Sequence, residues 1–135
     1  MDAVFVGADA LVARHLAAHP RHAWARRGWA RLSAERPRLV TIPAMLDAAA
    51  SELARAAEPA FAAERARRWA ASPALEVVVP DADDHHRALV WLERWRDPGV
   101  NLADCWAWAV MDRLRIATAF TASEPYRWAG HALLE

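Results

Sequence analysis

The chain has 135 residues, which is enough for one globular domain and too few for two, so we expect a single domain over residues 1–135. Seventeen basic and seventeen acidic side chains cancel to a net charge of zero, and this balance excludes bulk electrostatic attraction to nucleic acids or membranes. With 56% hydrophobic and 25% charged residues, the composition is typical of a folded protein and excludes a disordered one.

Short runs rich in β-branched residues alternate with longer alanine-rich stretches of helical spacing. We predict strands at Val4–Val6, Leu39–Thr41, Leu75–Val79 and Ile116–Phe120. The spacing predicts helices over about 10–18, 22–34, 43–57, 59–72, 82–96 and 102–114. This alternation is typical of an α/β fold with a mostly parallel sheet and helices on both faces. In such a sheet, ligands bind at the carboxyl ends of the strands.

Acidic side chains lie near that predicted edge of the sheet. Asp9 follows the first strand, Glu124 follows the fourth, and Asp104 lies one turn into the last long helix. Carboxylates that converge there would bind a hard divalent cation such as Mg²⁺. Each acid also has a structural alternative: Asp9 as a helix N-cap, Asp104 as the partner of Asn101 in a capping box, and Glu124 as a loop charge.

Other chemistries have weaker support. The run Asp83–His86 cannot converge on one ion, because neighbouring residues of a helix point about 100° apart. The single Cys105 has no evident activating histidine and excludes an internal disulfide, which is typical of a reducing cytoplasm. The four glycines are scattered, so the sequence has no glycine-rich phosphate loop.

Eight tryptophans exceed what one small core holds easily, so we expect some of them at an interface. Trp91 and Trp95 are one turn apart on a predicted helix that also carries arginines, and Trp24 and Trp29 lie on an earlier one. We predict that these four contribute to a partner surface. The alternative is that about half of the tryptophans pack in the core.

The order of these pieces resembles a PIN domain, and specifically the small VapC-type ribonuclease toxins of bacterial toxin–antitoxin systems. The resemblance extends over nearly the whole chain and is carried by Val4–Leu11, His22–Trp29, Leu39–Thr41, Asn101–Cys105 and Ala119–Thr121. It implies a three-layer α/β fold whose central, mostly parallel sheet has four to five strands flanked by helices. It also implies a homodimer, an antitoxin partner and RNA as the substrate. No run of the sequence approaches the ~18 apolar residues that a membrane span needs, so we expect a cytoplasmic protein without association with membranes.

PIN domains place three or four acids around one or two Mg²⁺ or Mn²⁺ ions, which activate water for RNA cleavage. This chain has Gly7, Ala48 and Ser123 at three of the matching positions. The fourth position is Asp104, near the start of the last long helix. The resemblance therefore implies an acidic site that has lost three of its four family acids.

Neighbouring acids are possible substitutes for those that are missing. Asp9 is well placed to replace an acid at Gly7, because positions 7 and 9 of an extended chain face the same side. Asp47 is a poor replacement for an acid at Ala48, since it points about 100° away on the helix. Glu52 is on the right face, although it lies about one turn further along.

We therefore expect an endoribonuclease with impaired activity. If it is active, Asp104 and Asp9 are the expected catalytic residues. These two and Glu124 are the expected ligands of Mg²⁺ or Mn²⁺, with Ser123 acting through water and nearby arginines holding phosphate. The alternative is a catalytically silent module that dimerises or binds an antitoxin-like peptide through its tryptophan-rich helices.

Overall fold

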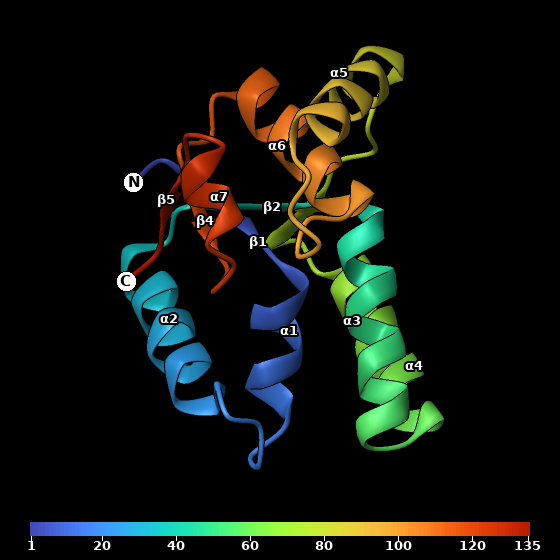
Figure 1. The fold of residues 1–135 in the computed structure, drawn as a ribbon. Coiled ribbons are helices and arrows are strands. Elements are labelled where there is room, and N and C mark those ends of the chain that lie inside the picture. Colours follow the sequence, from blue (N-terminus) through green and yellow to red (C-terminus); the bar gives the residue numbers. More distant parts are fainter.

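A parallel sheet forms the centre of the molecule, with helices on both of its faces (Figure 1). The computed structural model describes residues 1–135. Its strands are β1 (Ala3–Val6), β2 (Arg38–Thr41), β3 (Leu75–Val77), β4 (Thr118–Phe120) and β5 (Ala132–Leu133). They lie in the order β3-β2-β1-β4-β5, and all four neighbouring pairs are parallel. The predicted α/β fold with a sheet of four to five strands is confirmed.

Seven helices connect and cover the strands, and six of them match the predicted ones. They are α1 (Ala8–His15), α2 (His22–Glu35), α3 (Pro43–Ala56), α4 (Pro59–Ala71), α5 (Ala82–Arg94), α6 (Leu102–Leu114) and α7 (Pro125–Trp128). Helix α1 ends three residues earlier than predicted, and α7 and β5 were not predicted. None of the helices is both long and apolar enough to cross a membrane.

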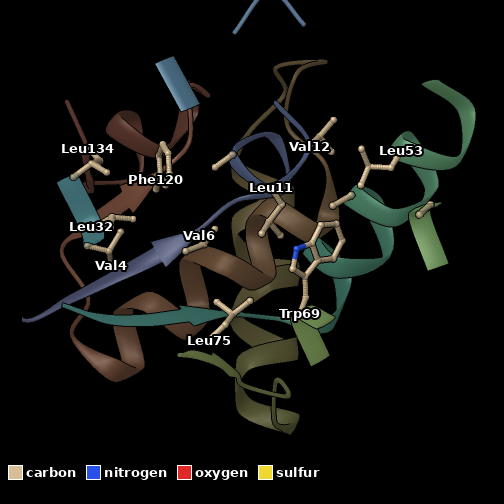
Figure 2. Close-up of a cluster of buried hydrophobic side chains, with 13 residues drawn as sticks. Val4, Val6, Leu11, Val12, Leu32, Leu53, Trp69, Leu75, Phe120 and Leu134 are labelled. Atoms are coloured by element: carbon tan, nitrogen blue, oxygen red, sulfur yellow. The ribbon is translucent and has the colours of Figure 1, made fainter. Parts of the chain in front are cut away.

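The alternation of side chains along β1 divides the core into two layers. Val4 and Val6 point to the face that α1 to α4 cover and belong to a buried cluster with Leu11 and Trp69; Figure 2 shows Val6 beside Leu11 and Val4 beside Leu32. Phe5 points to the opposite face and packs in a second buried cluster with residues of α5, α6 and α7. Both faces of the sheet are therefore covered, as the three-layer prediction requires.

Helix α2 lies unusually close to the sheet at Gly28. A Cβ atom at this position would lie 2.3 Å from the Phe120 ring, so only glycine allows this approach. Trp24 and Trp29 flank the same ring, with centroid distances of 4.9 and 5.3 Å. These two tryptophans of the predicted partner surface are therefore half-buried by the packing of α2 on β4.

The other two predicted partner residues pack in the same way on the opposite face. The rings of Trp91 and Trp95 lie 5.3 and 6.2 Å from the fully buried ring of Trp108. Trp95 also stacks on Trp128, which is 52% exposed. All four predicted tryptophans thus bury part of their surface within the protein itself, and their outer edges remain accessible.

An ion pair joins α5 to α6. The carboxylate of Asp84 is completely buried and accepts hydrogen bonds from Nε and Nη2 of Arg113 at 2.9 and 2.7 Å. Asp84 also closes a capping box with Asp81 at the start of α5. The Arg113 guanidinium lowers the pKa of Asp84 from its ordinary value. Within the run Asp83–His86, this aspartate therefore has a structural role.

Replacing Arg113 with methionine should lower the free energy of unfolding by about 2 kcal/mol at pH 7, because a buried charge loses its hydrogen-bonded partner. The folded-state pKa of Asp84 is depressed, so this contribution is present above pH about 4 and is lost as the pH falls through the folded-state pKa. Urea unfolding of the parent and of Arg113→Met measures the loss of unfolding free energy at pH 7 and at pH 3.

The control is Arg68→Met, which removes an exposed ion pair with Glu64 and should cost less than about 1 kcal/mol. An Arg113→Met effect of equal size at the two pH values would contradict the assignment of the stabilisation to the Asp84 carboxylate.

Candidate active site

The order of the strands creates a crevice at one edge of the sheet. After β1 the chain moves to β2 on one side, and later it returns to β4 on the other side, so the carboxyl ends of β1 and β4 flank a topological switch point. A cavity of about 260 Å³ opens there. It is lined by the turns after β1 and β4 and by α3, α6 and α7, with Gly7, Ala8, Asp9, Met45, Ala48, Glu52, Asn101, Ala103, Asp104, Thr121, Ser123 and Tyr126.

Asp9 connects the start of α1 to the end of β4. Its Oδ2 accepts hydrogen bonds from the Thr121 hydroxyl at 3.0 Å and from the Ala122 backbone N–H at 2.8 Å. Its Oδ1 accepts the N–H of Ala10 at 2.9 Å. The N-cap of α1 is Gly7, so the alternative that Asp9 caps this helix is wrong. The carboxylate instead faces the crevice from the first turn.

Gly7 and Asp9 compete for the same space. A Cβ atom at position 7 would lie 3.0 Å from Oδ1 of Asp9 and 3.1 Å from Cβ of Thr121, which is tighter than ordinary van der Waals contact. The Asp9 carboxylate therefore lies against the place where a side chain at position 7 would begin. A side chain at position 7 therefore requires the Asp9 carboxylate and Thr121 to shift by a few tenths of an ångström.

Asp104 faces the same crevice from the first turn of α6. It forms the predicted capping box with Asn101, and its Oδ1 accepts a hydrogen bond from the Tyr126 hydroxyl at 3.1 Å. Burial raises the pKa of Asp104, and the negative charge of Asp9 raises it further. The hydrogen bonds from Asn101 and Tyr126 oppose this shift. The two carboxylates therefore interact electrostatically within one cavity.

Comparisons with known proteins agree with this geometry. No family model matches the chain, and no curated protein matches its sequence. Among solved structures, VapC20 of Mycobacterium tuberculosis matches with a TM-score of 0.83 and 26% sequence identity, over 96% of each chain. Its crystal structure is described as that of a sarcin–ricin-loop-cleaving toxin. The chain has the PIN-domain fold of the VapC-type toxins. The resemblance drawn from the order of the sequence pieces is thus confirmed.

The VapC-like crevice gathers most of the predicted site residues. It is lined by all three positions where the resemblance implies a missing acid, together with Asp9, Asp104 and Glu52. Glu52 belongs to α3 and is exposed at the lining, as its position one turn after Ala48 suggested. No group of three or more His, Cys, Asp or Glu side chains is placed to share a metal ion.

Two other acids near these elements lie outside the crevice. The carboxylate of Glu124, a predicted metal ligand, pairs with Nε of Arg127 at 3.3 Å and lines a neighbouring cavity. The neighbouring Ser123 lines the crevice. Asp47 is exposed and lines a third cavity beside α5. The structure therefore brings Asp9 and Asp104 together and places Glu124 away from them.

Cys105 follows Asp104 but has no nucleophilic character. Its side chain is fully buried among apolar residues of the second core cluster. Burial raises the pKa of the thiol to about 11, and the negative charge of Asp104 adds to this effect. The thiolate is the reactive form, so this cysteine acts as a small core residue.

Substituting Gly7 with alanine should lower the free energy of unfolding by about 1–3 kcal/mol, because the added methyl group meets the Asp9 carboxylate and Thr121. Adding Asp9→Ala to Gly7→Ala removes one of the two contacts. The double variant should therefore lose less stability than the sum of the two single variants. Urea unfolding of the four proteins gives this coupling. Additive losses would contradict the shared volume of residues 7 and 9.

The pH dependence of stability should report on Asp104. Because the folded-state pKa of this acid is raised, its contribution favours folding at low pH and is lost as the pH rises through the folded-state pKa. Asp104→Asn does not titrate, so its unfolding free energy should rise relative to the parent between pH about 4 and pH 7.

Thermal unfolding in EDTA measures the difference in unfolding free energy between Asp104→Asn and the parent at each pH. The matched control is Asp47→Asn, which changes an exposed acid. A difference that falls with rising pH would contradict the burial of the Asp104 carboxylate.

Proposed function

We propose that this protein is a VapC-type toxin that cleaves RNA phosphodiester bonds, and that its metal-dependent activity is strongly weakened. The lining of the crevice is the observation that carries this proposal. Gly7, Ala48 and Ser123 stand where the family resemblance implies acids, while Asp9, Asp104 and Glu52 supply the carboxylates that line the crevice. The description of VapC20 as a sarcin–ricin-loop-cleaving toxin supports RNA as the substrate class.

The carboxylate oxygens in the crevice are sufficient to coordinate one divalent cation and insufficient to coordinate two. A carboxylate has about four acceptor sites, of which Asp9 uses three and Asp104 uses two for hydrogen bonds within the protein. Mg²⁺ commonly takes one or two carboxylates together with water and substrate phosphates. Glu52 also lines the crevice, but no three acids are placed to share an ion. A pair of ions about 3.5–4 Å apart needs more converging negative charge than Asp9 and Asp104 offer.

Asp104 and Asp9 would hold this single Mg²⁺ or Mn²⁺ ion, and Ser123 would contact it through water. A bound ion supplies an activated water and offsets the charge that develops on the phosphate. Tyr126 orients the Asp104 carboxylate through its hydrogen bond.

Arginines beside the crevice are placed to hold the phosphate of a substrate. The neighbouring cavity of about 510 Å³ shares Thr121 with the crevice and is lined by Arg21 and Arg27 of the α2 region. Arg127 lines it too, but this side chain is already paired with Glu124 and Glu135. Arg21 and Arg27 are therefore the cations available to an RNA phosphate next to the crevice.

A second function is favoured by the apolar surface of α5. Leu89, Val90 and Leu92 are about two-fifths exposed, and Trp128 adds a further exposed ring. Such a patch on a small protein marks a contact with another chain. In this alternative the crevice is silent, and the protein dimerises or binds an antitoxin-like peptide. A homodimer and a cytoplasmic location, where RNA is accessible, belong to both proposals.

Incubation with structured RNA should reveal slow cleavage by the parent that depends on Mg²⁺ or Mn²⁺. Asp104→Asn should reduce the rate by about 10²-fold or more, because it removes a charge that stabilises the transition state. Asp47→Asn, which changes an exposed acid outside the crevice, should cleave at the parental rate. Gel analysis of RNA products with and without EDTA measures each rate.

Restoring the missing acids tests the reason for the weak activity. Ala48→Glu combined with Ser123→Asp adds two carboxylates to the crevice without disturbing Asp9, and cleavage should rise by about 10²-fold. An inert parent with an active restored variant would favour the silent module. If both proteins are inert with either metal, the ribonuclease proposal is wrong. Sedimentation of the same samples reports whether the chain dimerises.

A further inference from the structure

Positive charge is concentrated in one part of a protein whose net charge is zero. Residues 10–37, which include most of α1 and all of α2, contain six arginines and a single acid, Glu35. Glu35 is paired with Arg31. None of the remaining arginines of this segment forms an ion pair, so the α1–α2 region has an excess of positive charge that the rest of the chain balances.

Two adjoining hollows form a continuous groove along α1 and α2, which we call the α1–α2 groove. Their volumes are about 370 and 550 Å³, and both are lined by Arg14, Trp29 and Ser33. Arg26 lines the first hollow and Arg36 lines the second. No aspartate or glutamate lines either hollow. The groove shares no residue with the crevice that holds Asp9 and Asp104.

The arginines of the groove are unpaired, and the guanidinium of one of them is held in place. Neither Arg14, Arg26 nor Arg36 takes part in an ion pair. The Arg14 guanidinium lies 4.6 Å from the centre of the Trp29 ring. Trp29 is fixed by a hydrogen bond of 3.0 Å from its Nε1 to the backbone carbonyl of Ala10. Arg36 ends α2 in the left-handed conformation, with φ 52°.

Cations also crowd the end of α1 from the neighbouring helix α4. Arg65 lies close enough to lower the pKa of Arg14, after the larger effect of burial. Burial, Arg65 and Arg14 together lower the pKa of His15 to about 4. The buried Nε of Arg65 has no hydrogen-bond partner. Neither Arg14 nor Arg65 forms an ion pair, so a bound anion would relieve this repulsion.

We propose that the α1–α2 groove binds the phosphate backbone of an RNA strand. The choice of RNA, among polyanions, rests on the proposed function. Guanidinium groups bind phosphate oxygens bidentately, and about 15 Å of helix separates Arg26 from Arg36, so the groove spans several phosphates.

An acidic amphipathic peptide fits the groove less well, because that mode of recognition requires a row of apolar pockets. Along α1, Arg14 lies about 7.5 Å from Asp9 in helix rise. The second hollow is lined by Pro37, Leu39 and Ala74, at the amino ends of β2 and β3, so the groove leads from Arg14 away from the crevice. Binding to the phosphate backbone alone is independent of sequence.

The salt dependence of RNA binding tests the groove. Fluorescence anisotropy of a short labelled single-stranded RNA, recorded in EDTA, reads binding without cleavage. In Arg26→Gln/Arg36→Gln, the slope of log affinity against log salt concentration should become shallower by about 1.4, which corresponds to two lost phosphate contacts. The matched control is Arg67→Gln/Arg96→Gln, two exposed arginines outside the groove, and it should keep the parental slope. Circular dichroism verifies that each variant is folded.

Each outcome bears on the groove separately from the proposed function. A parental slope in the groove variant overturns the inference, even if the parent cleaves RNA. A parent that binds RNA through the groove and never cleaves it supports the inference and refutes the proposed activity. Tighter binding of a polyglutamate peptide than of RNA, lost in the groove variant, would assign the groove to an acidic protein partner and overturn the RNA proposal.

Discussion

The parallel pairing of β1 with β4 determines where the chemistry of this protein lies. The two strands are joined in register from Val4 to Val6, and the backbone N–H of Gly7 extends the pairing by donating to the Phe120 carbonyl at 3.0 Å. The segments that follow β1 and β4 therefore leave the sheet side by side. Because of this, Asp9 and Thr121 are neighbours although 112 positions separate them in the sequence. The crevice follows directly from this alignment.

Most of the fold could be predicted because its elements are signalled locally. The β-branched runs predict the first four strands, and Pro43 and Pro59 lie in the first turns of α3 and α4, where proline is tolerated. Helix α7 and strand β5 are four and two residues long, too short for any periodic pattern. They exist because of tertiary contacts, since Tyr126 packs on Trp108 and β5 pairs with β4.

The topology of the sheet predicts that Asp9 and Asp104 share one edge, but the individual hydrogen bonds of the site were predictable only where they are local. Asn101 and Asp104 are three residues apart on one helix, so their capping box could be read from the sequence. The hydrogen bond from Tyr126 to Asp104 could not, because it depends on a helix without a sequence signal. Ser123 faces the crevice and Glu124 turns to Arg127, and no pattern distinguishes two neighbouring loop residues in this way.

The tight packing of Gly7 against Asp9 also constrains how this protein can evolve. Any lineage that carries an aspartate at position 9 meets a steric barrier at position 7, since even one added methyl group lies 3.0 Å from the carboxylate. A larger residue at position 7 requires the Asp9 carboxylate to shift by a few tenths of an ångström, whereas Ala48 is exposed at the crevice lining. Substitutions at positions 7 and 9 are thus coupled, and a larger residue at one position is best tolerated with a smaller residue at the other.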